Sequence, residues 1–181
     1  MSKLKFLATA SLLFMITAAN AQDGTITFTG EIVSNTCKIT TGGGDVTVTL
    51  PRISQNNFTA DARAGQTAFT IDLEDCTPAS GSVGVRFVGT STQIDTASGF
   101  FKNTDEGTAD GAANVSVGVY DSTDTLIKTA GNSSAVVAID TTGGTASIPL
   151  TAWYTKSDPN GSAVVTAGSL QAAGGIELVY Q

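Results

Sequence analysis

Two cysteines are the residues of this 181-residue chain whose type and spacing most readily suggest chemistry. Cys37 and Cys76 are separated by 38 residues, no C-x-x-C motif occurs, and the sequence contains no histidine. These features argue against a redox pair or a metal site and predict a structural disulfide, provided that the chain enters an oxidising compartment. On the chain-entropy model, closing a loop of this size contributes roughly 4 kcal/mol.

Other candidate catalytic groups are weak. Asp72 with Glu74 and Asp105 with Glu106 are carboxylate pairs, but solvated acids are far commoner than catalytic pairs. The Gly42–Gly44 run is followed neither by a helix signal nor by GK[ST], which argues against phosphate binding. We therefore expect no enzyme activity, no cofactor and no metal.

The single tryptophan, Trp153, lies in a predicted strand. It could be a platform for a sugar, but a role in packing or at a subunit interface is favoured. The sequence leaves open the side of the sheet on which it lies.

Residues 1–21 have the features of a signal peptide. Lys3 and Lys5 precede an apolar run from Phe6 to Ile16, and Ala19-Asn20-Ala21 provides the small residues of a cleavage site before Gln22. The apolar run is shorter than the roughly 20 residues that span a bilayer. We expect export, and no direct insertion of the mature chain into a membrane.

After removal of that segment, 7 basic and 16 acidic residues remain, a net charge near −9. The acidic residues are scattered along the chain. This balance argues against binding to nucleic acid or to anionic lipid.

Alternation of apolar and polar residues with a period of two dominates from residue 25 onward, which predicts strands. The predicted strands fall at 26–32, 46–50, 69–73, 83–87, 115–119, 126–127, 136–139, 148–154 and 170–180. Turn signals rich in glycine, proline and aspartate separate them, and 89–113 is expected to be a loop or an irregular edge. Seven to nine short strands at this spacing predict an all-β antiparallel sandwich.

The first and last predicted strands are both unusual. The first begins almost at the cleavage site and contains Gly30 among larger apolar residues, which is a weakness unless two backbones approach closely there. The last strand runs to Tyr180-Gln181, where an immunoglobulin-like sandwich would have one more strand.

Four features of the chain resemble the pilins of chaperone–usher fimbriae, most closely the rod subunits of type 1 fimbriae. They are Thr25-Ile-Thr-Phe-Thr-Gly-Glu-Ile-Val33 followed by Cys37; Cys76 closing the strand from Phe69; the segments Ala113–Val119 and Ile148–Tyr154; and a penultimate Tyr180 with Gly168 fourteenth from the end. The last feature is the pattern that the chaperones of this family recognise. The resemblance extends over the whole chain.

The resemblance implies an incomplete immunoglobulin-like β-sandwich that lacks its final strand, with an N-terminal donor-strand extension. On this chain the extension is 22–35 and the pilin domain is 36–181. The neighbouring subunit would receive the donor side chains Gly24, Ile26, Phe28, Gly30 and Ile32, with Gly30 in a shallow pocket and Ile32 in the pocket that a chaperone leaves open. The acceptor groove, which is also the site of chaperone recognition, would involve Gly168, Leu170, Ala172, Gly174, Ile176, Leu178 and Tyr180.

The implied partners are a periplasmic pilus chaperone, an outer-membrane usher and neighbouring pilin subunits. The implied location is a cell-surface fimbrium reached through the periplasm, where the fibre supports adhesion. Two alternatives remain open from the sequence: a minor tip or adaptor pilin of the same system, and a stand-alone β-sandwich that binds carbohydrate.

Overall fold

The computed structural model describes residues 26, 27, 29, 30, 32, 34, 36–40, 44–58, 62–128 and 131–181. The expected leader 1–21, the donor positions Gly24 and Phe28, and the start of the extension therefore lie outside the described residues. The chain divides into two units, Met1–Ile32 and Val33–Gln181, and the β-structure belongs to the second.

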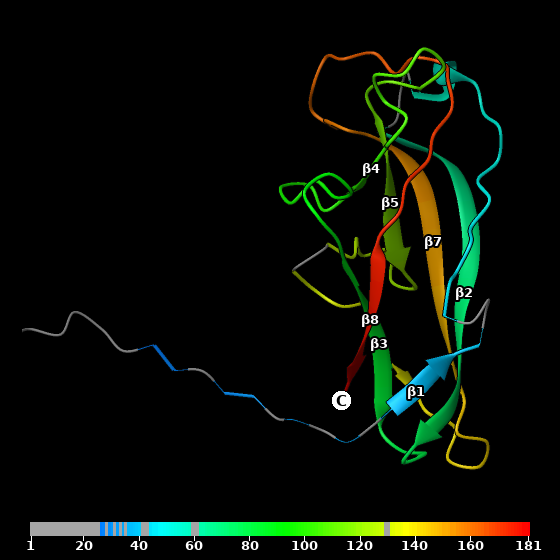
Figure 1. Ribbon diagram of the computed structural model, residues 1–181, viewed down its shortest axis with the longest axis vertical. Coiled ribbons are helices and arrows are strands. Elements are labelled where there is room, and N and C mark those ends of the chain that lie inside the picture. The colour runs from blue at the N-terminus through cyan, green and yellow to red at the C-terminus, as the bar shows by residue number, and fades with distance from the viewer. Residues whose placement is uncertain are drawn as a thin grey trace, which may run out of the picture. The chain divides into compact units, whose positions relative to one another are not determined.

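Five strands form the larger sheet, in the order β1-β2-β7-β5-β4 (Figure 1). Every pairing in it is antiparallel. The strands are β1 Thr36–Ile39, β2 Arg63–Thr77, β4 Phe101–Lys102, β5 Val115–Asp121 and β7 Ala146–Lys156.

The smaller sheet has three antiparallel strands in the order β6-β3-β8. They are β3 Ser82–Val88, β6 Val137–Ala138 and β8 Gly175–Tyr180. One 3-10 helix, η2 Gln55–Phe58, precedes β2. The architecture of two antiparallel sheets confirms the predicted all-β class.

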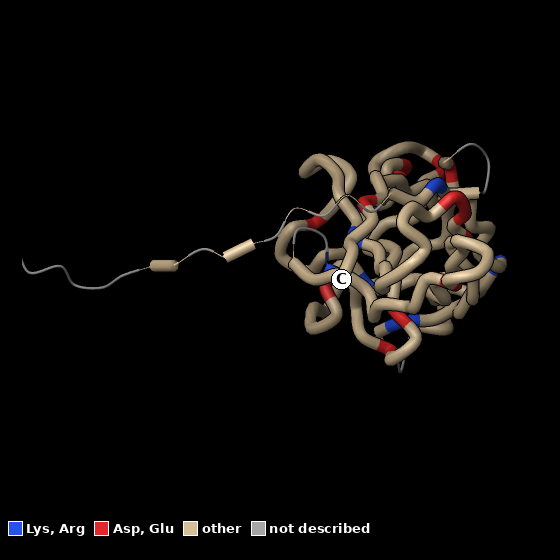
Figure 2. The backbone as a smooth tube through the Cα atoms, turned by 90° about the horizontal axis from the view of Figure 1, so that it is seen from below, with Lys and Arg blue, Asp and Glu red and all other residues tan. Residues whose placement is uncertain are grey.

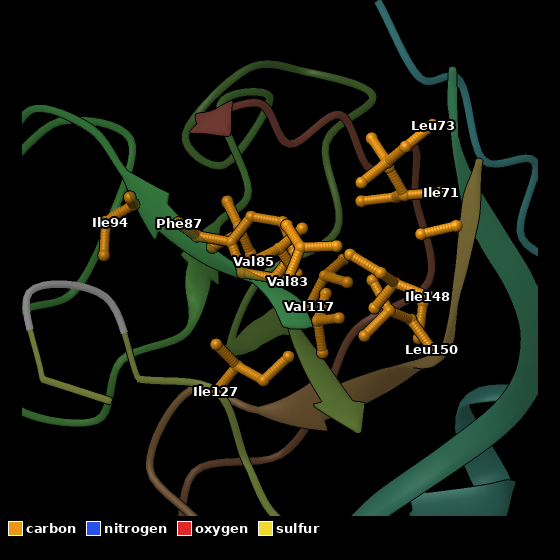
Figure 3. Packing of buried hydrophobic residues seen from close by; sticks show 14 of the residues in the cluster. Ile71, Leu73, Val83, Val85, Phe87, Ile94, Val117, Ile127, Ile148 and Leu150 are labelled. Atoms are coloured by element: carbon orange, nitrogen blue, oxygen red, sulfur yellow. The ribbon is translucent and has the colours of Figure 1, made fainter. Parts of the chain in front are cut away.

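Alternating apolar residues of the two sheets meet in one core (Figure 3). Val83 and Val85 of β3 are fully buried, and Ile71 of β2 pairs in register with Ile148 of β7. The period of two explains this arrangement, because alternate side chains of a strand point to the same face of its sheet. The core therefore requires side chains from both sheets at once.

The disulfide joins Cys37 of β1 to Cys76 of β2. β1 pairs only with β2 and has four residues, so few backbone contacts hold it. The covalent bond fixes the start of the domain to the edge of the larger sheet.

The structure corrects three predicted strands. At 126–127 it has an isolated bridge between Leu126 and Tyr120 rather than a strand. No strand is assigned to 46–50, although Val46, Val48 and Leu50 are half-buried and alternate with exposed threonines as the pattern requires. The final strand β8 begins at Gly175 rather than at residue 170. The predicted and observed strands differ for one physical reason. Alternation predicts which side chains are buried, whereas a strand also needs a hydrogen-bonded neighbour.

Charged residues are distributed over many parts of the domain (Figure 2). Acidic positions are mixed with a few basic ones, and ion pairs join Lys38 to Asp75 and Arg86 to Glu177 at the surface. Exposed pairs of this kind contribute little to stability, and the hydrophobic core carries most of it.

Replacing the buried Ile148 by alanine should lower the free energy of unfolding by about 2–5 kcal/mol, because the substitution leaves a cavity between the sheets. Urea denaturation of the purified chain measures this change. Val164→Ala is the matched control, because Val164 is exposed and its truncation should change stability by less than about 0.5 kcal/mol. Equal effects of the two variants would contradict the assignment of Ile148 to the core.

Candidate functional site

A groove of about 800 Å³ opens into the hydrophobic core between two extended segments of the domain. One rim is 44–50 and the other is 170–176, which leads into β8. The groove is lined by side chains of both sheets, and most of these side chains are themselves buried.

The floor of the groove is apolar. It is made by Phe69, Ile71, Phe87, Phe101, Val117, Val119, Ala152 and Tyr154. The rings of Phe87 and Phe101 pack edge to face with centroids 5.2 Å apart. Burial raises the pKa of Tyr154, as expected for a phenol in a poorly solvated site. A ligand for this groove must present apolar side chains.

In the part of the chain that the structure describes, β8 pairs with β3 along one edge and with no strand along the other. Ser82 and Gln181 exchange two backbone hydrogen bonds of 2.8 and 2.9 Å, which fixes the alternation along the β3–β8 ladder. In an antiparallel ladder every second residue bonds to the partner strand and the others point their backbone groups away from it. The amides and carbonyls of Ile176, Leu178 and Tyr180 therefore point away from β3.

The opposite rim, 44–50, offers the same kind of edge. It has the alternating burial of a strand, but none of the described strands pairs with it. Among the described residues, no hydrogen bond joins it to 170–180. An additional strand lying in the groove could pair with both rims.

The predicted acceptor residues divide into two groups. Leu170, Ile176, Leu178 and Tyr180 pack against the core, and Ala172 lines the groove. Gly174 and Gly168 have steric reasons for lacking a side chain, since a Cβ would collide with Phe101 at Gly174 and with the backbone of 110–112 at Gly168. Their small size is thus explained by packing within the domain.

Of the predicted donor side chains, the structure describes those of Ile26 and Ile32. They are 76% and 101% exposed, which is unusual for large apolar side chains. A Cβ added at Gly30 would meet nothing within 4 Å.

Asn103 holds one end of the groove rim in place. Its side-chain nitrogen donates to the carbonyls of Ala112 and Ser169 at 2.7 and 3.1 Å, and its oxygen accepts from the amides of Asp105 and Gln171 at 3.0 Å. All four hydrogen-bonding capacities of the amide are used and the residue is buried. Asn103 thus fixes the position of 169–171.

The other end of the rim is tied to β1. The amide of Cys37 donates to the hydroxyl of Tyr180 at 2.8 Å. The penultimate tyrosine thereby connects β8 to the disulfide-linked start of the domain.

The described residues offer no group of three or more His, Cys, Asp or Glu side chains that could hold a metal ion. Within the same residues, no helix has the length and apolar character needed to cross a membrane.

The model of the fimbrial protein family matches residues 26–181. The chain belongs to the fimbrial protein family. It is 31% identical to the type-1 fimbrial protein, C chain, of Escherichia coli, over 99% of both chains. It is also 42% identical to the major fimbrial subunit SMF-1 of Stenotrophomonas maltophilia (strain K279a), over 63% of this chain and 67% of that protein.

Solved structures agree in fold. A chaperone–usher pilus subunit covers 91% of this chain and 99% of its own length with a TM-score of 0.59 at 22% identity. The P pilus rod subunit PapA gives a TM-score of 0.55 at 20% identity, over 80% of this chain and 99% of that one. This fimbrial subunit is thus a structural protein with the pilin fold, and pilins of its family assemble with one another into cell-surface fimbriae.

Sequence reasoning missed two parts of the groove. It predicted 46–50 as a strand without assigning it to a rim, although the alternation of Val46, Val48 and Leu50 with threonines was a usable signal. It also missed Asn103, because three of its four hydrogen bonds join it to residues 9, 66 and 68 positions away, and only the bond from the Asp105 amide is local.

Asn103→Ala should lower the free energy of unfolding by roughly 2–4 kcal/mol, because it removes the four hydrogen bonds of a buried amide and leaves the buried Ala112 carbonyl without this donor. Hydrogen exchange at the Gln171 amide should accelerate in the same variant. Asn160→Ala, at an exposed loop position, is the control and should leave both quantities unchanged. Native stability in Asn103→Ala would show that the rim is held by other contacts.

Proposed function

We propose that this chain is the rod-forming subunit of its fimbria and polymerises by donor-strand exchange. Each copy inserts its extension, 22–35, into the groove of the next copy. The inserted side chains are Gly24, Ile26, Phe28, Gly30 and Ile32. This is β-strand addition, in which backbone hydrogen bonds supply affinity and side-chain pockets supply register.

The observation that carries this proposal is the groove with two unpaired edges above an apolar floor. Neighbouring strands in a sheet lie about 4.7–4.9 Å apart and pair through their backbones. A strand between 44–50 and β8 would satisfy both rims and cover the exposed part of the core. The sandwich would then gain the strand that an immunoglobulin-like fold has at this position.

The extension has the composition that such an insertion requires. Ile26 and Ile32 are exposed, and burying each large apolar side chain contributes about 1.5–3 kcal/mol before ordering costs. Gly30 has no side chain, which suits a close approach between the inserted strand and the groove of a partner.

The proposal includes the route of the chain to the cell surface. Residues 1–21 direct export and are removed before Gln22, and Cys37 and Cys76 are oxidised in the periplasm. An open apolar edge is an aggregation hazard, so a periplasmic chaperone occupies the groove until an outer-membrane usher exchanges it for the next subunit.

A rod role is supported over a minor one by the relatives. SMF-1 carries the name of a major subunit, and PapA, a rod subunit, has the same fold. The presence of both a donor segment and an acceptor groove in one chain suits a subunit that repeats along a fibre.

A synthetic peptide spanning 22–35 should stabilise a truncated domain that begins at residue 36. We expect a rise in melting temperature of roughly 5–15 °C at saturating peptide, the order of magnitude for burial of three large apolar side chains in a domain of this size. Thermal unfolding followed by circular dichroism measures this rise.

The matched peptides are Phe28→Asp and Thr29→Asp. The first places a charge at a predicted inward position and should abolish the rise, whereas the second changes a predicted outward position and should preserve most of it. A truncated domain that ignores the native peptide, or that responds equally to both variants, would refute donor-strand complementation.

A further inference from the structure

Tyr154 of β7 faces the groove. It lines the groove together with Ala152, whereas Trp153, which lies between them in the strand, lines a separate cavity with Tyr120. Successive side chains of a strand point to opposite faces of its sheet. The alternation settles the side of the sheet on which Trp153 lies, which is the outer face, and it places the Tyr154 ring at the groove.

The hydroxyl of Tyr154 holds the end of one rim. It donates a hydrogen bond of 3.2 Å to the carbonyl of Pro51, the residue that directly follows the rim 44–50. Burial raises the pKa of this phenol, so the hydroxyl keeps its proton and remains a donor at physiological pH. One side chain thus connects the wall of the groove to its rim.

Gly65 of β2 provides the space for the Tyr154 ring. A Cβ at Gly65 would lie 2.7 and 3.1 Å from two ring carbons of Tyr154 and 3.3 Å from Ile53. The backbone of Gly65 is left-handed, with a φ of +68°, and the register between β2 and β7 shifts here, between Ala64 and Thr67. Both the free space and the backbone conformation require a glycine, and the result is a seat for the ring against β2.

Apolar contacts hold the rest of this rim. Val46, Val48 and Leu50 pack against the core, but within the described ranges no residue of 44–50 makes a hydrogen bond. Hydrophobic contacts are non-directional, so they keep the rim near the core without fixing the direction of its backbone amides and carbonyls. The directional contact is the hydrogen bond at Pro51.

Pro51 extends the effect of this anchor into the rim. The proline ring fixes its own φ at about −65°. The residue before a proline, here Leu50, is restricted to extended backbone. A chain anchored at the Pro51 carbonyl therefore enters the rim in the extended form that pairing with another strand needs.

The opposite rim begins at the same end of the groove. Leu170 is the first residue of the rim 170–176, and Ile53 lies two residues beyond Pro51. Both pack with Tyr154 against a smaller hydrophobic cluster, whose buried members are Phe58, Ala64, Ala112, Val115 and Val165. The ends of the two rims are held at one cluster, to which Tyr154 belongs.

We propose that Tyr154 is a positioning residue for donor-strand insertion: its hydroxyl holds the rim 44–50 where an inserted strand can pair with it. A strand between two rims needs a neighbour about 4.7–4.9 Å away on each side. Holding a rim in advance lowers the ordering cost of insertion. This inference rests on the proposed function, because it requires that 22–35 enters the groove.

Removal of the hydroxyl tests this role. The parent acceptor is the mature chain 22–181 carrying Phe28→Asp, so that its own extension does not insert, and the probe is a fluorescein-labelled peptide spanning 22–35. Tyr154→Phe in this acceptor should weaken peptide binding roughly three- to tenfold, the effect of one neutral hydrogen bond, while the ring stays on Gly65. Fluorescence anisotropy measures the dissociation constant.

Tyr120→Phe is the matched control. It removes the same hydroxyl from the neighbouring strand β5, in the cavity of the outer face, and should leave the affinity for the peptide within about twofold. Equal weakening by Tyr154→Phe and Tyr120→Phe would overturn the proposal.

Thermal unfolding separates positioning from a general role in stability. Tyr154 is half-buried and Pro51 is exposed, so water can replace their hydrogen bond in the empty domain. Tyr154→Phe should therefore melt within about 2 °C of the parent acceptor although its affinity for the peptide falls. A clearly larger loss in melting temperature would assign Tyr154 a role in stability and would contradict positioning.

Gly65→Ala tests the seat of the ring. The added Cβ should displace the Tyr154 ring and weaken peptide binding by at least as much as Tyr154→Phe. Gly144→Ala introduces strain at another left-handed glycine, with a φ of +61°, outside the groove, and it should lower stability while the folded protein keeps its affinity. Equal weakening by both glycine variants would show an effect of general strain and would overturn the assignment of the seat.

Binding to the parent acceptor distinguishes this inference from the function on which it rests. If the peptide 22–35 fails to bind the parent acceptor, donor-strand exchange and the role of Tyr154 are both contradicted. If it binds the parent acceptor and the Tyr154→Phe variant equally well, donor-strand exchange stands and only the role of Tyr154 is contradicted.

Discussion

The free edge of β8 is the constraint on which the rest of the structure depends. Backbone amides and carbonyls are obligatory hydrogen-bonding groups, and an edge that presents them beside an apolar floor is unstable unless something pairs with it. In this domain the groups of Ile176, Leu178 and Tyr180 face such a floor without a neighbouring strand. The groove is bounded by this unpaired edge, and the proposed donor-strand exchange depends on it.

Several contacts keep that edge straight and open while it is unpaired. Asn103 fixes 169–171 through four hydrogen bonds, and Tyr180 accepts a hydrogen bond from Cys37 at the other end. The disulfide then connects Cys37 to β2 of the opposite sheet. These contacts anchor the two ends of the rim to different parts of the sandwich.

Much of the fold could be predicted from the sequence because side-chain alternation reports burial. Ile71, Val83, Val117 and Ile148 were all placed in strands by their period of two, and each is buried in the core. The segment 46–50 shows the limit of this signal. Its side chains follow the predicted alternation, but pairing depends on a neighbouring strand, and among the described residues no strand pairs with it.

The residues that surround Trp153 could not be predicted from the sequence, for a different reason. Trp153 was visible as a single tryptophan, but its relation to Arg63, Gly118 and Tyr120 arises from the register of three strands that are distant in sequence. A bulge between Ala64 and Thr67 shifts that register on β2, and sequence alternation alone does not locate such a shift.

Residue-resolved hydrogen exchange along β8 tests the central claim most directly. In the domain without a donor strand, the amides of Gly175, Glu177 and Val179, which face β3, should be protected, and those of Ile176, Leu178 and Tyr180 should exchange rapidly. Adding the 22–35 segment in trans should protect the second set and leave the first unchanged. Protection of both sets without the donor, or continued rapid exchange of the second set when the donor is bound, would contradict the account of an unpaired edge completed by a neighbouring subunit.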